Sequence, residues 1–221
     1  MPKVLIVVSS HDQLGDSGKP TGYLLSEAAV PWDIFTDAGL ESDFVSPAGG
    51  KAPMIGDRAA PESAAFLAAF GEEGPETVTP DEVSAEDYQA IFYVGGHGAM
   101  YDFADNEKLA SIASTIWERG GIVSAVCHGP AGLLNVKLSD GSYLINGKRV
   151  SAWPDDQESS AEYIPFLLET ELEARGALHE GAPRGESKVI VDGRLITGQN
   201  PQSCVALARA LVDTLATVMV G

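Results

Sequence analysis

The feature that most constrains the fold is the segment 121–132, where an apolar run ends at Cys127 and is followed at once by His128. The run is nearly continuous Ile, Val and Ala, which is typical of a strand packed on both faces within a parallel sheet. Gly129 can form the bend, and Pro130 is tolerated in a first helical turn. The pattern predicts a strand-to-helix corner that presents Cys127 over the carboxyl end of the sheet.

Cys127 is the first candidate for chemistry. At such a corner the amide groups and the positive dipole end of the following helix favour thiolate over thiol. A cysteine nucleophile also needs a group to manage its proton and amides to hold an oxyanion. The alternative is a buried structural cysteine, because unpaired cysteines are among the most buried residues in proteins.

Strand-like and helix-like segments alternate along the chain. Strands are expected at residues 3–8, 44–46, 90–94, 121–126 and 150–153, with a hairpin at 189–197. Helices are expected at residues 23–38, 63–70, 106–119, 164–175 and 203–218, and Pro31 should kink or interrupt the first of them. This order predicts a single α/β domain over residues 1–221, with a doubly wound, mostly parallel sheet covered by helices on both faces.

The charge balance bears on possible partners. The chain has 32 Asp and Glu against 14 Lys and Arg, a formal net charge of -18, so nucleic acid and anionic membranes should be repelled. A simpler explanation of the charge is a solvated acidic surface. No segment reads as a signal peptide or a membrane span, and two cysteines are too few for a disulfide framework. We therefore expect a cytoplasmic protein.

Two neighbouring segments could complete a site around Cys127. Gly96 and His97 lie in a glycine-rich stretch that ends the strand 90–94, so its amides could form an oxyanion pocket with the amide of His128. A Gly-Gly-X-Gly sequence by itself is equally typical of a plain turn. Either Glu158 or Asp156, on the acidic segment after residues 150–153, could orient the imidazole of His128, and spacing does not choose between them.

Four groups of residues together resemble the PfpI/DJ-one superfamily, over nearly the whole chain. They are Ser26 and Glu27 with Pro31 and Phe35, residues 95–98 with 102, 103 and 106, residues 125–131, and residues 192–201. Their combination is similar to the glutathione-independent glyoxalase (glyoxalase III) branch, also described as chaperone-like. The resemblance implies a flavodoxin-like fold, usually a homodimer, that converts methylglyoxal and related 2-oxoaldehydes to 2-hydroxy acids such as lactate without metal or cofactor.

The same resemblance assigns roles to individual residues. Cys127 matches the nucleophile, His128 its partner, and Glu27 the acid that touches the sulfur, although spacing alone predicts a solvated glutamate in a first helical turn. Glu158 matches the third member of the triad, because it stands five residues past Trp153.

The implied chemistry starts from a hemithioacetal on the cysteine. Gly96, His97 and His128 are expected to bind the substrate, with amides near Gly96 and His128 holding the oxyanion. Glu27 or His128 would move the carbon-bound proton, and Glu27 and the sulfur are expected to share one proton.

Other functions remain open at this point. The chain could be a stress-related holdase or a cysteine redox sensor without turnover, or a deglycase whose effect reflects removal of free aldehyde. A glutamine amidotransferase is disfavoured, because the only histidine after His128 is His179, whose second neighbour is Gly181 rather than an acid. Lys and Arg are scarce in the motif segments, which favours a small neutral substrate.

Overall fold

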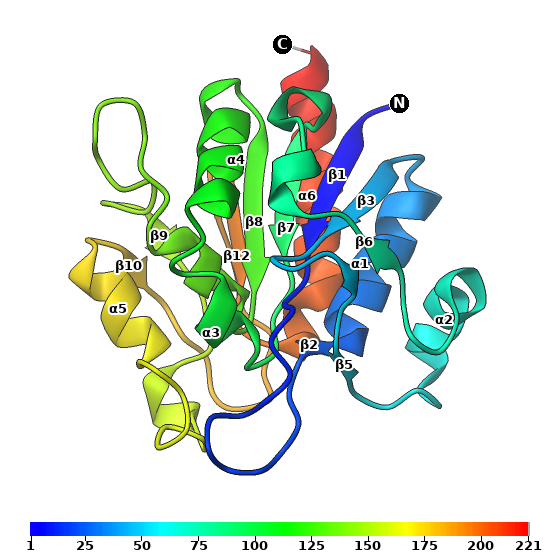
Figure 1. Ribbon diagram of the computed structural model, residues 1–221. Coiled ribbons are helices and arrows are strands. Elements are labelled where there is room, and N and C mark those ends of the chain that lie inside the picture. Colours follow the sequence, from blue (N-terminus) through cyan, green and yellow to red (C-terminus); the bar gives the residue numbers. More distant parts are fainter. Residues whose placement is uncertain (221) are drawn as a thin grey trace.

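A central sheet of six strands organises the computed structural model, which describes residues 1–220 (Figure 1). Its strands follow one another in space in the order β11 (Val189–Asp192), β12 (Leu195–Gly198), β8 (Ile122–Val126), β7 (Ala90–Tyr93), β1 (Lys3–Val7) and β3 (Glu41–Val45). All neighbouring pairs are parallel except β11 with β12, which form an antiparallel hairpin at one edge. The carboxyl ends of five strands therefore meet at one edge of the sheet.

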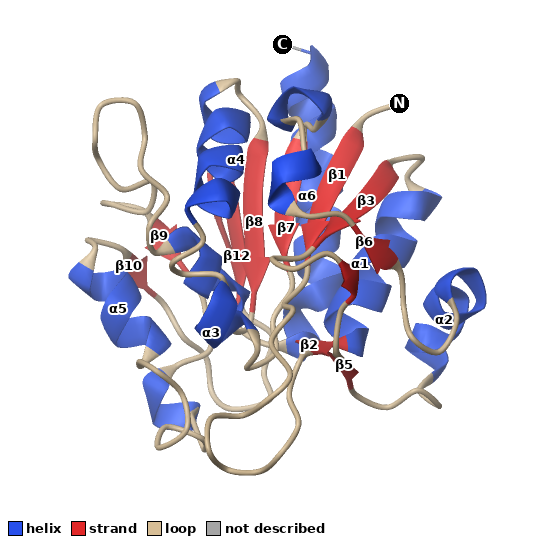
Figure 2. Cartoon of the chain, in the orientation of Figure 1, coloured by secondary structure: helices blue, strands red, loops and turns tan. Residues whose placement is uncertain are grey.

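Helices cover both faces of this sheet (Figure 2). On one face α1 (Leu25–Asp37) packs against α6 (Cys204–Val220), and on the other lies α4 (Glu107–Glu118). The remaining helices are short: α2 (Ala64–Phe70), α3 (Ala99–Asp102) and α5 (Leu168–Ala174). The result is a three-layer α/β/α arrangement, which confirms the predicted fold class.

The alternation of side chains along each strand explains why two cores form. In β1, Val4 and Ile6 belong to the core shared with α1 and α6, whereas Leu5 and Val7 belong to the core shared with α4. Every residue of β8 is buried, as expected for a central parallel strand with no water-facing side. This burial fixes the position at which β8 ends, and with it the position of Cys127.

Small strand pairs shape the loops beyond the sheet. They are β2 (Tyr23–Leu24) with β5 (Met54–Ile55), β4 (Gly50–Lys51) with β6 (Glu76–Thr77), and β9 (Arg149–Val150) with β10 (Leu178–His179). Within residues 1–220, no helix combines the length and the apolar content that crossing a membrane requires.

The structure refines four local predictions from the sequence. Helix α1 is not interrupted at Pro31, because its buried face against α6 and the sheet outweighs the missing hydrogen bond. The helix predicted after Cys127 is present as a 3-10 helix, Gly129–Leu133. The strand expected at 150–153 is only the pair Arg149–Val150, and the helix expected from 164 begins at Leu168.

Candidate active site

Cys127 sits at a strained elbow directly after β8. Its φ angle is 59°, and it is the only non-glycine residue with positive φ in the described part of the chain. Two backbone hydrogen bonds hold this geometry: the Cys127 amide donates to Gly198 (2.9 Å), and the Trp153 amide donates to the Cys127 carbonyl (2.9 Å). A Cβ at Gly129 would collide with the backbone of Tyr93, so glycine is required at the bend. Strain of this kind is common at nucleophile elbows, where it orients the reactive atom.

Glu27 approaches the sulfur from the first turn of α1, and its side chain is completely buried. Gly95 makes room for it, because a Cβ there would collide with a Glu27 carboxylate oxygen and would also press on Cys127. Within residues 1–220 neither oxygen makes a well-formed hydrogen bond, although the Cys127 thiol and the Gly95 amide are close enough to lower the pKa. Burial dominates, and it raises the pKa of Glu27 to about 8.

The protonation of Cys127 differs from the sequence-based expectation. Burial, followed by the nearby Glu27 carboxyl, raises the pKa of the thiol well above its ordinary value. The amides of Gly96 and His128 act in the opposite direction, which places both amides near the sulfur. The expectation that the corner favours thiolate was wrong, because a five-residue 3-10 helix offers little dipole to offset the burial. Burial therefore favours the thiol form of Cys127 at rest.

His128 links the sulfur to Glu158. Its Nδ1 lies 3.3 Å from Cys127 Sγ, and its Nε2 lies 2.8 Å from a Glu158 oxygen. Burial lowers the pKa of His128 to about 4, so the ring is neutral at pH 7. Burial acts to raise the pKa of Glu158, but hydrogen bonds from His128 and His97 outweigh it and hold that pKa far below its usual range. A carboxylate next to Nε2 places the proton on Nε2, which leaves Nδ1 free to accept the thiol proton.

The carboxyl that faces His128 is Glu158, whereas Asp156 is exposed on the preceding 3-10 turn. The Glu158 side chain is 3% exposed and also accepts a hydrogen bond from the Ser160 amide (2.7 Å). His97 adds a contact that the sequence did not suggest. Its Nε2 lies 3.1 Å from the other Glu158 oxygen, so one carboxylate holds two imidazole rings.

A cavity of about 340 Å³ opens onto these residues. Cys127, His128, Gly96 and His97 contribute to its lining. Arg184 also lines the cavity and was missed in the sequence, because it lies on a loop outside every motif segment. All six predicted site residues thus come together at the carboxyl edge of the sheet: Cys127, His128, Gly96, His97, Glu158 and the buried Glu27.

His97, His128 and Glu158 could in principle hold a metal ion, because one ligand atom from each lies within 4.8 Å of the others. Two imidazoles and a carboxylate are ligands that divalent transition metals accept. These same atoms already satisfy one another by hydrogen bonds. The expectation of a metal-independent site therefore stays a prediction, which we address by experiment below.

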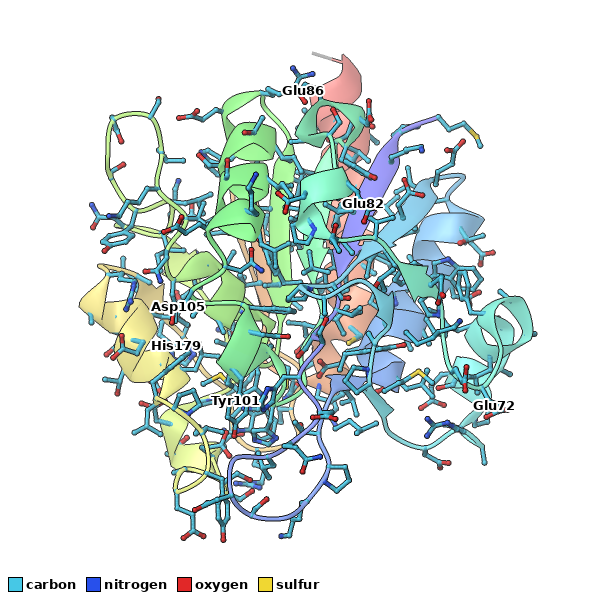
Figure 3. All side chains as sticks on the ribbon, in the orientation of Figure 1. Glu72, Glu82, Glu86, Tyr101, Asp105 and His179 are labelled. Carbon is cyan, nitrogen blue, oxygen red and sulfur yellow. The ribbon has the colours of Figure 1, made fainter. Side chains whose placement is uncertain are left out.

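His179, labelled in Figure 3, lies on β10 and does not line the cavity. Its Nδ1 is 2.9 Å from a Glu169 oxygen, so its partner is a residue of α5. The downstream histidine is therefore occupied elsewhere, as expected for a chain without the amidotransferase arrangement.

The parallel sheet and the strained cysteine elbow define the class: an α/β protein with a cysteine poised at the end of a central strand. A family model described as the DJ-1/PfpI family matches residues 21–214. The chain belongs to this family, and the resemblance noted in its sequence is confirmed.

Similar proteins extend over almost the full length. The chain is 33% identical to the glutathione-independent glyoxalase HSP31 of Saccharomyces cerevisiae, covering 96% of this chain and 98% of that protein. It is 30% identical to glyoxalase 3 of Candida albicans, with the same coverage. Among solved structures, glyoxalase III of Candida albicans has a TM-score of 0.83 at 27% identity, covering 96% and 97% of the two chains. The rapid encystment protein of Francisella tularensis has a TM-score of 0.91 at 33% identity, covering 97% and 99%.

Proposed function

We propose that this protein is a glutathione-independent glyoxalase that converts methylglyoxal and related 2-oxoaldehydes to 2-hydroxy acids. The observation that carries the proposal is the buried Glu27 carboxyl beside the Cys127 thiol, next to a neutral imidazole held by Glu158. Full-length similarity to proteins named glutathione-independent glyoxalases supports it. The reaction needs a thiol, a proton acceptor and a group that moves a proton between carbons, and these three groups are Cys127, His128 and Glu27.

The first step is addition of the sulfur to the aldehyde carbon. As the C–S bond forms, the thiol proton passes to Nδ1 of His128, whose Nε2 proton remains on the hydrogen bond to Glu158. The negative charge on the former aldehyde oxygen is stabilised by the amides of Gly96 and His128. The product of this step is a hemithioacetal on Cys127.

The second step moves hydrogen within the substrate. Glu27 is mostly protonated at pH 7, and its minor ionised form takes the proton from the carbon bound to sulfur, giving an enediol, and returns it to the neighbouring carbon. One carbon is thereby oxidised and the other reduced, so no external oxidant is needed, and the product is a thioester of the 2-hydroxy acid. Water then cleaves the thioester, which releases the acid and restores the thiol. We assign the transfer to Glu27 because its pKa of about 8 lies close to neutral pH.

A redox sensor without turnover fits these residues less well. Such a role requires an accessible thiol of low pKa, whereas Cys127 is 4% exposed and the pKa of its thiol is raised. The experiment below separates a holdase role from catalysis, whereas removal of sugar adducts stays a prediction.

The test is incubation with methylglyoxal in the absence of glutathione, with lactate measured directly. We expect lactate from the unmodified protein and none from Cys127→Ala. Cys204→Ala is the matched control, because Cys204 is also buried but does not line the cavity. Absence of lactate formation by the unmodified protein would overturn the proposal, and protection of unfolded clients that survives Cys127→Ala would favour the holdase role.

A further inference from the structure

The cavity above Cys127 is larger than a three-carbon aldehyde requires. Its volume is about 340 Å³, within the roughly 300–1,000 Å³ that is typical of small-molecule sites. Leu24, Ile55, Trp153 and Pro201 supply apolar lining, and Arg184 is the only basic residue among the lining residues besides the two histidines. The cavity therefore combines apolar lining with one permanently charged side chain, Arg184, which is exposed to solvent.

Buried side chains hold the loop that carries Arg184. The Ala182 amide donates to Gln199 Oε1 (2.6 Å), and the side-chain amides of Gln157 and Gln199 both donate to the Ala182 carbonyl (2.9 Å each). On the other side of Arg184, Asn200 Nδ2 donates to the Glu186 carbonyl (2.7 Å). The loop is thus fixed on both sides of the arginine.

The guanidinium itself is positioned but not neutralised. Its Nη2 donates to the Gln157 carbonyl (2.6 Å), a neutral acceptor. Among the side chains that the structure describes, no carboxylate lies within 4.0 Å of it, although most of the other arginines have such a partner or stack on an aromatic ring. An arginine offers five N–H donors in a planar fork that matches a carboxylate, and most of them remain available here.

We propose that Arg184 determines specificity by binding a carboxylate at the far end of a longer 2-oxoaldehyde, whose aldehyde carbon reaches Cys127. This inference rests on the proposed glyoxalase function and names a substrate class for it: 2-oxoaldehydes that carry a terminal carboxylate. A single cation balances a single negative charge. A chain of net charge -18 opposes anions in general, so a preference for an anionic substrate requires a local contact of this kind. The sequence-based expectation of a small neutral substrate depended on the scarcity of Lys and Arg in the motif segments. Arg184 lies outside those segments and was therefore not considered.

The experiment compares 4,5-dioxopentanoate with its methyl ester, which has the same five-carbon backbone with one added methyl group and no charge. The acid is converted to 2-hydroxyglutarate by the same hydrogen transfer and one water, so mass spectrometry of the product follows the reaction. We expect a higher kcat/KM for the acid than for the ester, and we expect Arg184→Gln to lower the ratio of the two roughly tenfold or more. Arg209→Gln, an exposed arginine of α6 outside the cavity, removes the same charge and should leave the ratio unchanged.

Two results separate this inference from the proposed function. If methylglyoxal is converted but the acid has no advantage over the ester, or Arg184→Gln leaves the ratio unchanged, the inference is overturned and the function stands. If no aldehyde is converted, calorimetric binding of 2-hydroxyglutarate to the Cys127→Ala protein still tests the contact. Binding that Arg184→Gln weakens supports the carboxylate site, and binding that it leaves unaltered, or no binding, overturns it.

Discussion

Replacing Glu27 by Gln tests both the chemistry and the electrostatics of the site. Gln has nearly the same shape and needs no proton to be neutral, so the fold should persist. If Glu27 moves the carbon-bound proton, kcat should fall roughly a hundredfold or more, the usual contribution of general acid–base catalysis. Glu62→Gln, on an exposed residue, is the matched control and should retain full turnover.

The same variant should change how stability depends on pH. In the folded protein the pKa of Glu27 is about 8, against an ordinary value of 4.5, so between these values the folded state keeps a proton that the unfolded chain has released. The contribution of this proton to the free energy of unfolding is at its full value below pH 4.5. It decreases above pH 4.5 and is lost as pH rises through 8. The slope in between is about 1.4 kcal/mol per pH unit.

The window from pH 6.5 to 8 isolates this effect. Burial raises the pKa of Asp102 to about 6 and lowers that of His128 to about 4, but both proteins contain these groups, so their titration cancels in the difference between the two proteins. Allowing for the smaller slope near pH 8, the unmodified protein should lose about 1.5 kcal/mol relative to Glu27→Gln across it.

Urea denaturation of the two proteins at pH 6.5, 7.25 and 8 measures the difference. Parallel pH dependences would show that Glu27 is not held neutral in the folded state. Near-normal turnover of Glu27→Gln would exclude it as the group that moves the proton. Either result refutes the corresponding part of the reasoning, and the two parts can fail independently.

Three further predictions concern the rest of the site and the assembly. Glu158→Gln should lower kcat roughly a hundredfold or more because His128 loses its orienting carboxylate, whereas Asp156→Asn should not alter it; equal effects would contradict the assignment. Dialysis against EDTA should leave the methylglyoxal kcat unchanged, and a loss restored by a divalent metal would place an ion on the cluster of His97, His128 and Glu158. Sedimentation velocity should give the mass of a homodimer, as the family resemblance implies, and a monomer at all concentrations would contradict it.

The order of strands and helices could be predicted from the sequence because it depends on local apolar runs. The strand before Cys127, Ile122–Val126, is buried at every position, and it ends where the sequence indicates. Pro31 shows the limit of local propensity, because packing of α1 against α6 decided the outcome there. Glu27 and Cys127 lie far apart along the chain, so no local pattern indicated that Glu27 would be buried against the sulfur. Only the family resemblance suggested this contact.

Loop paths account for the features of the site that the sequence did not reveal. The contact of His97 with Glu158 depends on how the acidic loop returns to the sheet, and the place of Arg184 depends on side-chain hydrogen bonds to a backbone carbonyl. The protonation of Cys127 was misjudged because burial is a property of the assembled fold. In each case the deciding partner lies far away in sequence.

The hydrogen bond from the Cys127 amide to Gly198 has a consequence for synthesis and folding. The reactive side chains of Glu27, Cys127, His128 and Glu158 are all translated before β12. Of the two backbone hydrogen bonds that hold the elbow, however, the one to Gly198 forms only when β12 pairs with β8. A nascent or truncated chain that stops before β12 would contain every reactive group but lack the hydrogen bond to Gly198. We therefore expect full activity only after β12 has joined the sheet.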